Sequence, residues 1–358
     1  MKEKNRMNRK LLRAKSKMKK KLYNWLSRHD LMTVSAAISG CLVLIVSGSV
    51  ALFIFSACKQ MGTNDRNTGK EIVASDTLCN AHYRRPDIPQ MMTDPQQRAF
   101  YYVKHYWDGY SLADTAFIRS DDTEQLFSDF INALQYVDPE ESSTALKRMM
   151  SRMEEDSTAY SRFCFLSEKY LYEPNSPMRN EEYFIPILEQ MIDSKRLTEY
   201  EKIRPVDQLK QAHKNRPGMI AADFSYVTPG GKTAKLSQLK SDYILLFFYD
   251  PDCTSCQEFE RVLSEMPFFL DIQKKGILRV LAVYPDRDEN EWLLKSSKMP
   301  KNWIVGWNKR GDIRSKTLYE IRATPTLYLL DKQKKVILKD TPLESIIQYL
   351  SVSTQNIN

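Results

Sequence analysis

The sequence has few of the side chains from which metal centres are built. Its 358 residues include four histidines and six cysteines. His82, His105 and His213 are scattered, and no HxxxH or HxxE pair places two ligands one helical turn apart. A second CxxC is also missing, whereas a structural zinc site needs four ligands. The sequence therefore predicts no metal centre and no bound cofactor.

Beyond its first 30 residues the chain also lacks an excess of positive charge. The formal net charge is +8, but residues 1–30 carry twelve Lys or Arg against Glu3 and Asp30, a net of +10. The other 328 residues therefore sum to −2. Nucleic-acid binding depends on many cationic contacts to phosphates. This distribution argues against a nucleic-acid partner and predicts that residues 1–30 are a basic cytoplasmic segment.

Charge is absent from the run between Leu31 and Ala57. About 20 apolar residues suffice to span a bilayer as a helix, and flanking Lys and Arg stay on the cytoplasmic side. We therefore expect residues 31–58 to anchor the chain and the rest to lie in the periplasm of a Gram-negative-type envelope. The anchor is either an uncleaved helix or a lipoprotein signal in which Cys58, after Phe55-Ser56-Ala57, is lipidated. A buried core helix is disfavoured because no polar face interrupts the run.

Residues 59–84 are predicted to be a polar tether, and residues 85–215 an all-α domain. Apolar residues recur there at three- and four-residue spacings, and glycine is nearly absent. Thr93 or Asp94 can cap the first helix. The further helices are expected at 123–136, 143–154, 158–172, 181–193 and 205–214.

The pattern changes at residues 216–358. Two short strand-like segments flank Pro229-Gly230-Gly231, which indicates a hairpin, and the apolar run 243–249 is typical of a strand buried on both faces. The order of elements predicts an α/β fold with a mixed central sheet and helices on both faces. Further strands are expected at 277–284, 304–307, 326–330 and 336–338, and helices at 253–269, 289–297, 316–321 and 342–350.

The segment Cys253-Thr254-Ser255-Cys256 falls where the buried strand gives way to a helix. The amides and dipole of a helix N-terminus favour a thiolate at the first cysteine. The second cysteine, one turn further, can resolve a mixed disulfide. We therefore predict Cys253 as the nucleophile and Cys256 as the resolving thiol. A structural disulfide and a zinc site are the alternatives for this pair.

These motifs resemble a known family. Phe224 with its hairpin, the segment 235–240, the strand before Cys253, and Ala323-Thr324-Pro325-Thr326 are similar to thioredoxin-like domains of the TlpA/ResA type, related to the AhpC/TSA superfamily. The resemblance implies that Thr324–Pro325 is a cis bond facing the CxxC, with the Thr324 backbone binding substrate as an added strand. Residues 85–215 resemble a helical domain of unknown function that precedes such modules.

The chain departs from this family at three places. Asp252 replaces a tryptophan before the first cysteine, Phe247 stands where thioredoxins bury an aspartate, and Phe259 stands where related reductases carry a glutamate. The acceptor of the Cys256 proton therefore stays open.

Acidic side chains flank the first cysteine. Asp250 and Asp252 oppose the formation of a thiolate at Cys253, because nearby like charge disfavours a second negative group. We therefore expect a reductant rather than a strong oxidant.

The sequence thus predicts a membrane-tethered thiol–disulfide oxidoreductase that acts on disulfides of exported proteins. A membrane thiol donor would supply its electrons. The alternative is an envelope protein that binds a partner and uses the thioredoxin-like fold as a scaffold with little redox turnover. Whether Cys79 and Cys164 pair is open at this point.

Overall fold

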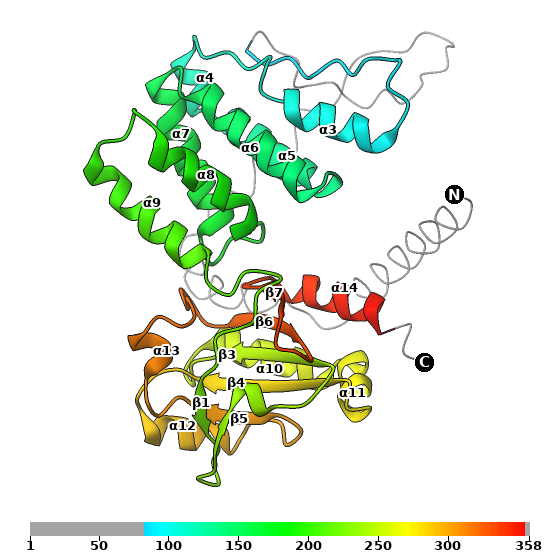
Figure 1. Cartoon of the computed structure of the whole chain (residues 1–358), viewed down its shortest axis with the longest axis vertical. Coiled ribbons are helices and arrows are strands. Elements are labelled where there is room, and N and C mark those ends of the chain that lie inside the picture. The colour runs from blue at the N-terminus through cyan, green and yellow to red at the C-terminus, as the bar shows by residue number, and fades with distance from the viewer. Residues whose placement is uncertain (1–81, 355–358) are drawn as a thin grey trace, which may run out of the picture. The chain divides into compact units, whose positions relative to one another are not determined.

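The computed structural model describes residues 82–354, all of which lie within one unit of the chain, Ser75–Asn358 (Figure 1). The predicted basic segment, the predicted anchor at residues 31–58 with Cys58, and Cys79 lie outside the described residues. Among residues 82–354, no helix is both long enough and apolar enough to cross a membrane.

The first part of the described chain is helical, as expected (Figure 1). Its core is rich in aromatic side chains, and the buried Trp107 ring meets Phe163 edge to face with centroids 4.8 Å apart. The elements are α3 (Pro95–His105), α4 (Thr115–Arg119), α5 (Asp121–Ala133), η1 (Leu134–Tyr136), α6 (Pro139–Met153), α7 (Ser157–Ser167), the π-helical turn η2 (Glu168–Tyr172), α8 (Glu181–Asp193) and α9 (Glu199–Ala212).

Side-chain caps set where these helices begin. Asp94 accepts hydrogen bonds from two backbone amides and caps α3, as the sequence predicts. The predicted start of the last helix at residue 205 is wrong, because Thr198 and Glu201 form a capping box that begins α9 at Glu199. Pro205 therefore lies inside the helix, where it removes one backbone hydrogen bond without ending it.

The second part of the chain is built on a seven-stranded sheet with the order β2-β1-β5-β4-β3-β6-β7. β3 pairs parallel with β4 and antiparallel with β6, so the sheet is mixed, as predicted. The strands are β1 (Ser225–Val227), β2 (Thr233–Lys235), β3 (Tyr243–Phe248), β4 (Leu278–Tyr284), β5 (Ile304–Trp307), β6 (Thr326–Asp331) and β7 (Val336–Lys339).

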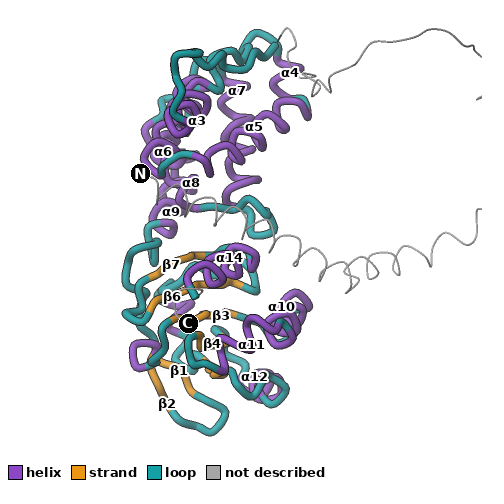
Figure 2. Tube along the Cα trace, turned by 90° about the vertical axis from the view of Figure 1, so that its right-hand side faces the viewer, coloured by secondary structure: helices purple, strands orange, loops and turns teal. Residues whose placement is uncertain are grey.

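Helices cover both faces of this sheet because successive side chains of the central strand point to opposite sides. Leu246 and Phe248 of β3 pack in a cluster with Ile313 of α13 (Asp312–Ser315). Phe247 points the other way and stacks on Phe259 of α10 (Thr254–Glu265), with ring centroids 6.4 Å apart. Figure 2 shows α10, α11 (Pro267–Lys274) and α12 (Glu289–Ser296) on one side of the strands.

Two predicted helices differ from the structure. The helix expected at 253–269 is divided, because α10 ends at Glu265 and Pro267 takes the first position of α11. The prediction of a helix at 316–321 is wrong. The helix lies earlier, at Asp312–Ser315, and Thr317 has a φ of 47°, which a right-handed helix cannot contain. The chain closes with α14 (Leu343–Ser353).

Candidate active site

Cys253 occupies the N-cap of α10, in the loop that follows β3. Its backbone is extended, and its sulfur accepts a hydrogen bond from the Cys256 amide at 3.1 Å. An amide that points at the sulfur stabilises negative charge there, as does the positive end of the helix dipole. The fold thus places the first cysteine at the start of a helix, with a backbone amide directed at its sulfur.

The two cysteines differ in their surroundings. Cys253 is half-buried, whereas Cys256 is only 2% exposed. Burial raises the pKa of the Cys256 thiol to about 12, and the neighbouring Cys253 acts in the same direction. A thiol with so high a pKa stays protonated at neutral pH, so it is a weak nucleophile until it loses its proton. The geometry therefore separates an attacking thiol from a protected one.

The segment before β6 lies against the first cysteine. The Thr324–Pro325 bond is cis, as the resemblance implied. The Cys253 thiol donates a hydrogen bond to the backbone oxygen of Thr324 at 3.3 Å. Residues 71 positions apart in the chain are thus brought together, and the four residues singled out by the sequence gather at one place.

The sequence analysis missed a partly buried ion pair whose carboxylate lies on the same face of α10 as Cys256. Glu260 lies four residues after Cys256, a spacing that puts both side chains on one face of α10. Its carboxylate is 2.7 Å from the ammonium of Lys295 in α12, and both side chains are 15% exposed. The i,i+4 spacing was the available signal, but only the packing of α12 shows that this glutamate is partly buried and paired with Lys295.

Tyr249, directly after β3, lies in the same region. Its side chain is fully buried, and its hydroxyl makes no hydrogen bond to any described residue. Burial raises the pKa of Tyr249 most, and the charges of Glu260 and Cys256 raise it further. The ionisation of the Tyr249 phenol is thus influenced by both the Cys256 thiol and the Glu260 carboxylate.

Acidic side chains surround the mouth of the site, as the sequence indicates. The pKa of Glu291 in α12 is raised, first by partial burial and then by the charges of Asp250 and Asp252. Tyr284 donates a hydrogen bond to the same carboxylate at 3.1 Å. The site is therefore flanked by negative charge on two elements.

The third described cysteine lies away from this site. Cys164 in α7 is a free thiol, and burial raises its pKa to about 12. Its suggested partner, Cys79, lies outside the described residues. In the part of the chain from residue 82 to residue 354, no three His, Cys, Asp or Glu side chains lie close enough to hold a metal ion.

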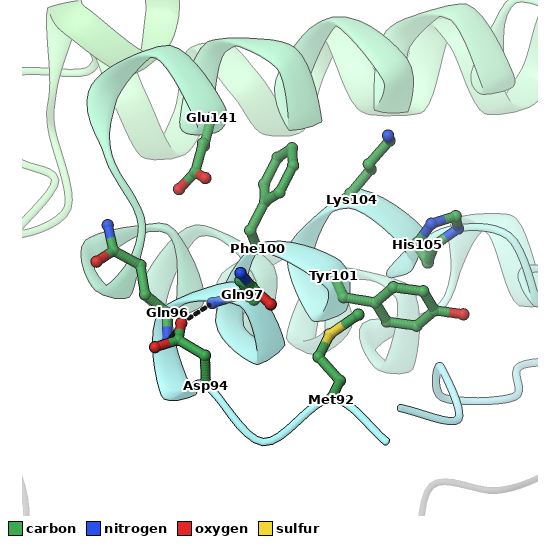
Figure 3. A pocket seen from close by; sticks show the side chains of 9 residues that line it. All are labelled: Met92, Asp94, Gln96, Gln97, Phe100, Tyr101, Lys104, His105 and Glu141. Carbon is green, nitrogen blue, oxygen red and sulfur yellow. Dashed lines mark hydrogen bonds between the residues drawn. The ribbon is translucent and has the colours of Figure 1, made fainter. Parts of the chain in front are cut away.

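A separate open pocket of about 540 Å³ lies on the helical part of the chain (Figure 3). Figure 3 shows the Asp94 carboxylate turned toward the amide of Gln97, a bond of 2.8 Å that caps α3. The Asp94 carboxylate is therefore already engaged in capping α3. The lining residues are Met92, Asp94, Gln96, Gln97, Phe100, Tyr101, Lys104, His105 and Glu141.

Alkylation should distinguish the two cysteines. At about pH 8, near the pKa of an ordinary thiol, we expect iodoacetamide to label Cys253 of the reduced protein well before Cys256. Because the pKa of Cys256 is raised, its thiolate is scarce below that value and its labelling should accelerate as the pH rises toward 12. Peptide mapping by mass spectrometry measures both sites. Labelling in urea is the control, and equal rates in the folded protein would contradict the assignment.

Comparison with known families and structures gives the following matches. Residues 57–215 match a family described as a domain of unknown function, and residues 241–336 match one described as thioredoxin-like. A thioredoxin-like protein from Bacteroides caccae is 41% identical over 75% of this chain and 98% of its own, with a TM-score of 0.71. A conserved protein of unknown function from Bacteroides fragilis is 56% identical over 38% of this chain and 98% of its own, with a TM-score of 0.37.

A domain of a possible thiol-disulfide isomerase from Cytophaga hutchinsonii is 27% identical over 40% of this chain and 97% of its own, with a TM-score of 0.35. No curated protein matches the chain. The resemblance to a thioredoxin-like domain after a helical domain of unknown function is thereby confirmed. Since the similarity to the Bacteroides caccae protein spans nearly all of that protein, this chain belongs to the family of thioredoxin-like proteins.

Proposed function

We propose that this protein is a thiol–disulfide oxidoreductase that reduces disulfides of exported proteins in the periplasm. The observation that carries the proposal is the placement of Cys253. The Cys253 sulfur accepts a hydrogen bond from the backbone amide of Cys256 at 3.1 Å. The same sulfur lies 3.3 Å from the backbone oxygen of Thr324. A substrate strand that pairs with the segment around Pro325 would present its disulfide to that sulfur.

The reaction proceeds in two exchanges. The Cys253 thiolate attacks one sulfur of the substrate disulfide, which forms a mixed disulfide and expels the other sulfur as a thiolate that takes up a proton. Cys256 then loses its proton and attacks the Cys253 sulfur. The substrate leaves with both sulfurs reduced, and the protein holds a Cys253–Cys256 disulfide. Two electrons from a membrane thiol donor restore the dithiol.

Glu260 is the group best placed to receive the proton of Cys256. It follows Cys256 by one helical turn on the same face of α10, and Lys295 holds its partly buried carboxylate at 2.7 Å. Glu260 would thereby take the place of the acidic groups for which this chain has Phe247 and Phe259.

The sidedness rests on the N-terminal sequence. The basic residues 1–30 and the uncharged run 31–57 support an anchor that leaves the site outside the cytoplasm. Lipidation at Cys58 is the alternative form of the same anchor. The donor and the substrates would therefore be proteins of the envelope.

The reduction potential of the CxxC pair tests this function. We expect a potential near that of thioredoxin, about −270 mV, together with turnover of insulin disulfides by the reduced protein. The measurement is equilibration with dithiothreitol mixtures, followed by alkylation and mass analysis of Cys253 and Cys256. A far lower potential without insulin turnover would overturn the proposal and favour the partner-binding scaffold.

A further inference from the structure

A buried cluster of charges joins the helical part to the thioredoxin-like part. Glu181 begins α8, whereas Arg322, Lys339 and Asp340 belong to the thioredoxin-like part. Their side chains are between 4% and 11% exposed. Burying charges costs free energy that only well-made partners offset, and removing one partner leaves the others uncompensated. This cluster therefore depends on both parts of the chain.

Lys339, at the end of β7, reaches the helical part. Its ammonium is 2.6 Å from the Glu181 carboxylate and donates to the backbone oxygens of Gln211, Ala212 and Lys214. These oxygens lie at the end of α9, where the helix dipole favours a cation. The contact fastens the sheet to two helices at once.

Arg322 makes the contact that matters for the site. Its guanidinium lies 4.1 Å from the centre of the Tyr172 ring and donates to the backbone oxygen of Tyr172. It also pairs with Glu181 at 3.2 Å and with Asp340 at 2.5 Å. The Tyr172 hydroxyl donates to Glu320 at 2.8 Å. Residues of the helical part thus hold both ends of the segment Glu320–Arg322.

The segment held in this way leads directly into the redox site. Arg322 is two residues before Thr324, whose oxygen accepts the Cys253 thiol, and three before the cis Pro325. Tyr172 ends the π-helical turn η2, and such irregular turns often mark functional places in helices. The path from the helical part to the substrate-binding segment is therefore two peptide units long.

We propose that the helical part acts as a clamp, in which Tyr172 and Glu181 position Arg322 and so fix the backbone of Thr324 for pairing with a polypeptide substrate. This rests on the proposed function and gives the helical part a role in it. Tyr172 and Glu181 are positioning residues that touch neither the substrate nor the thiols. A purely structural interface would support stability without favouring one kind of substrate.

Two substrates of different size separate these roles. In the proposed mechanism insulin pairs with the Thr324 backbone, whereas dithiobis-nitrobenzoate is a small disulfide that needs only the thiols of Cys253 and Cys256. For Tyr172→Leu and Glu181→Gln in the full chain we expect KM for insulin to rise about tenfold with kcat little changed, as for lost binding. The rate with dithiobis-nitrobenzoate should equal that of the unchanged protein.

Arg216→Gln is the matched control. Arg216 pairs with Glu182 across the same interface at 2.6 Å, but neither residue contacts the segment Glu320–Arg322. Its loss should leave both rates unchanged. Thermal melts follow stability in all variants, and the near-isosteric Glu181→Gln decides the outcome if Tyr172→Leu does not fold.

The outcomes are distinct. Unchanged insulin kinetics in a folded Glu181→Gln, or an equal fall with both substrates, would overturn the clamp. An Arg216→Gln variant whose KM for insulin rises as much as that of Glu181→Gln would also overturn the clamp. If the unchanged protein reacts with dithiobis-nitrobenzoate but never turns over insulin, the proposed function itself fails.

Discussion

Replacing Cys253 by serine is expected to lower the rate of insulin reduction to the uncatalysed background. The serine hydroxyl cannot ionise near neutral pH, so no nucleophile remains at the N-cap of α10. The loss should exceed about a thousandfold, since a missing nucleophile is not replaced by its neighbours. The measurement is insulin precipitation with dithiothreitol as the electron source.

Cys164→Ser is the control for this variant. Cys164 is the other described free thiol outside the CxxC, and it lies in α7 of the helical part. We expect this variant to retain the activity of the unchanged protein. A Cys253→Ser variant that still reduces insulin as well as the unchanged protein would remove Cys253 from its role.

Replacing Cys256 by serine is expected to stop the reaction after its first half. Cys253 can still attack, but no thiol is left to break the mixed disulfide. A covalent adduct with the substrate should therefore accumulate in about one equivalent, since each molecule can turn over only once. Non-reducing electrophoresis and mass spectrometry detect it. Full turnover without an adduct would show that Cys256 does not resolve the intermediate.

A milder change at the same step tests the proton acceptor. Glu260→Gln keeps the shape of the side chain but removes the carboxylate that faces Lys295. We expect the second thiol release from dithiobis-nitrobenzoate to slow while the first is unchanged. Glu258→Gln is the matched control, because Glu258 lies on the same helix but pairs with Arg261 at the surface. Equal slowing in both variants would count against Glu260.

The parts of the site that are local in sequence could be predicted. The CxxC at a strand–helix junction is a local pattern, and the mixed sheet followed from the order of apolar runs. Short-range periodicity and turn chemistry were sufficient for these two features. The cis bond before Pro325 was expected only from the family resemblance of the segment around it.

The parts that depend on packing between distant segments could not be predicted. The partner of Glu260 is 35 residues away, and the oxygen that holds Arg322 is 150 residues away. Local reasoning also placed a helix across Thr317, whose left-handed backbone becomes apparent only in the folded chain. Tertiary contacts override local propensity at such places.

The position of Lys339 has a consequence for the order in which the chain matures. Ribosomes make the helical part first, and it can begin to fold before the rest exists. The carbonyl oxygens at the end of α9 receive their cation from β7, the last of the described strands to be made, whereas Glu181 already has Arg322 as a partner by then. A nascent or truncated chain that stops before this strand therefore lacks the ammonium from which those carbonyl oxygens accept hydrogen bonds.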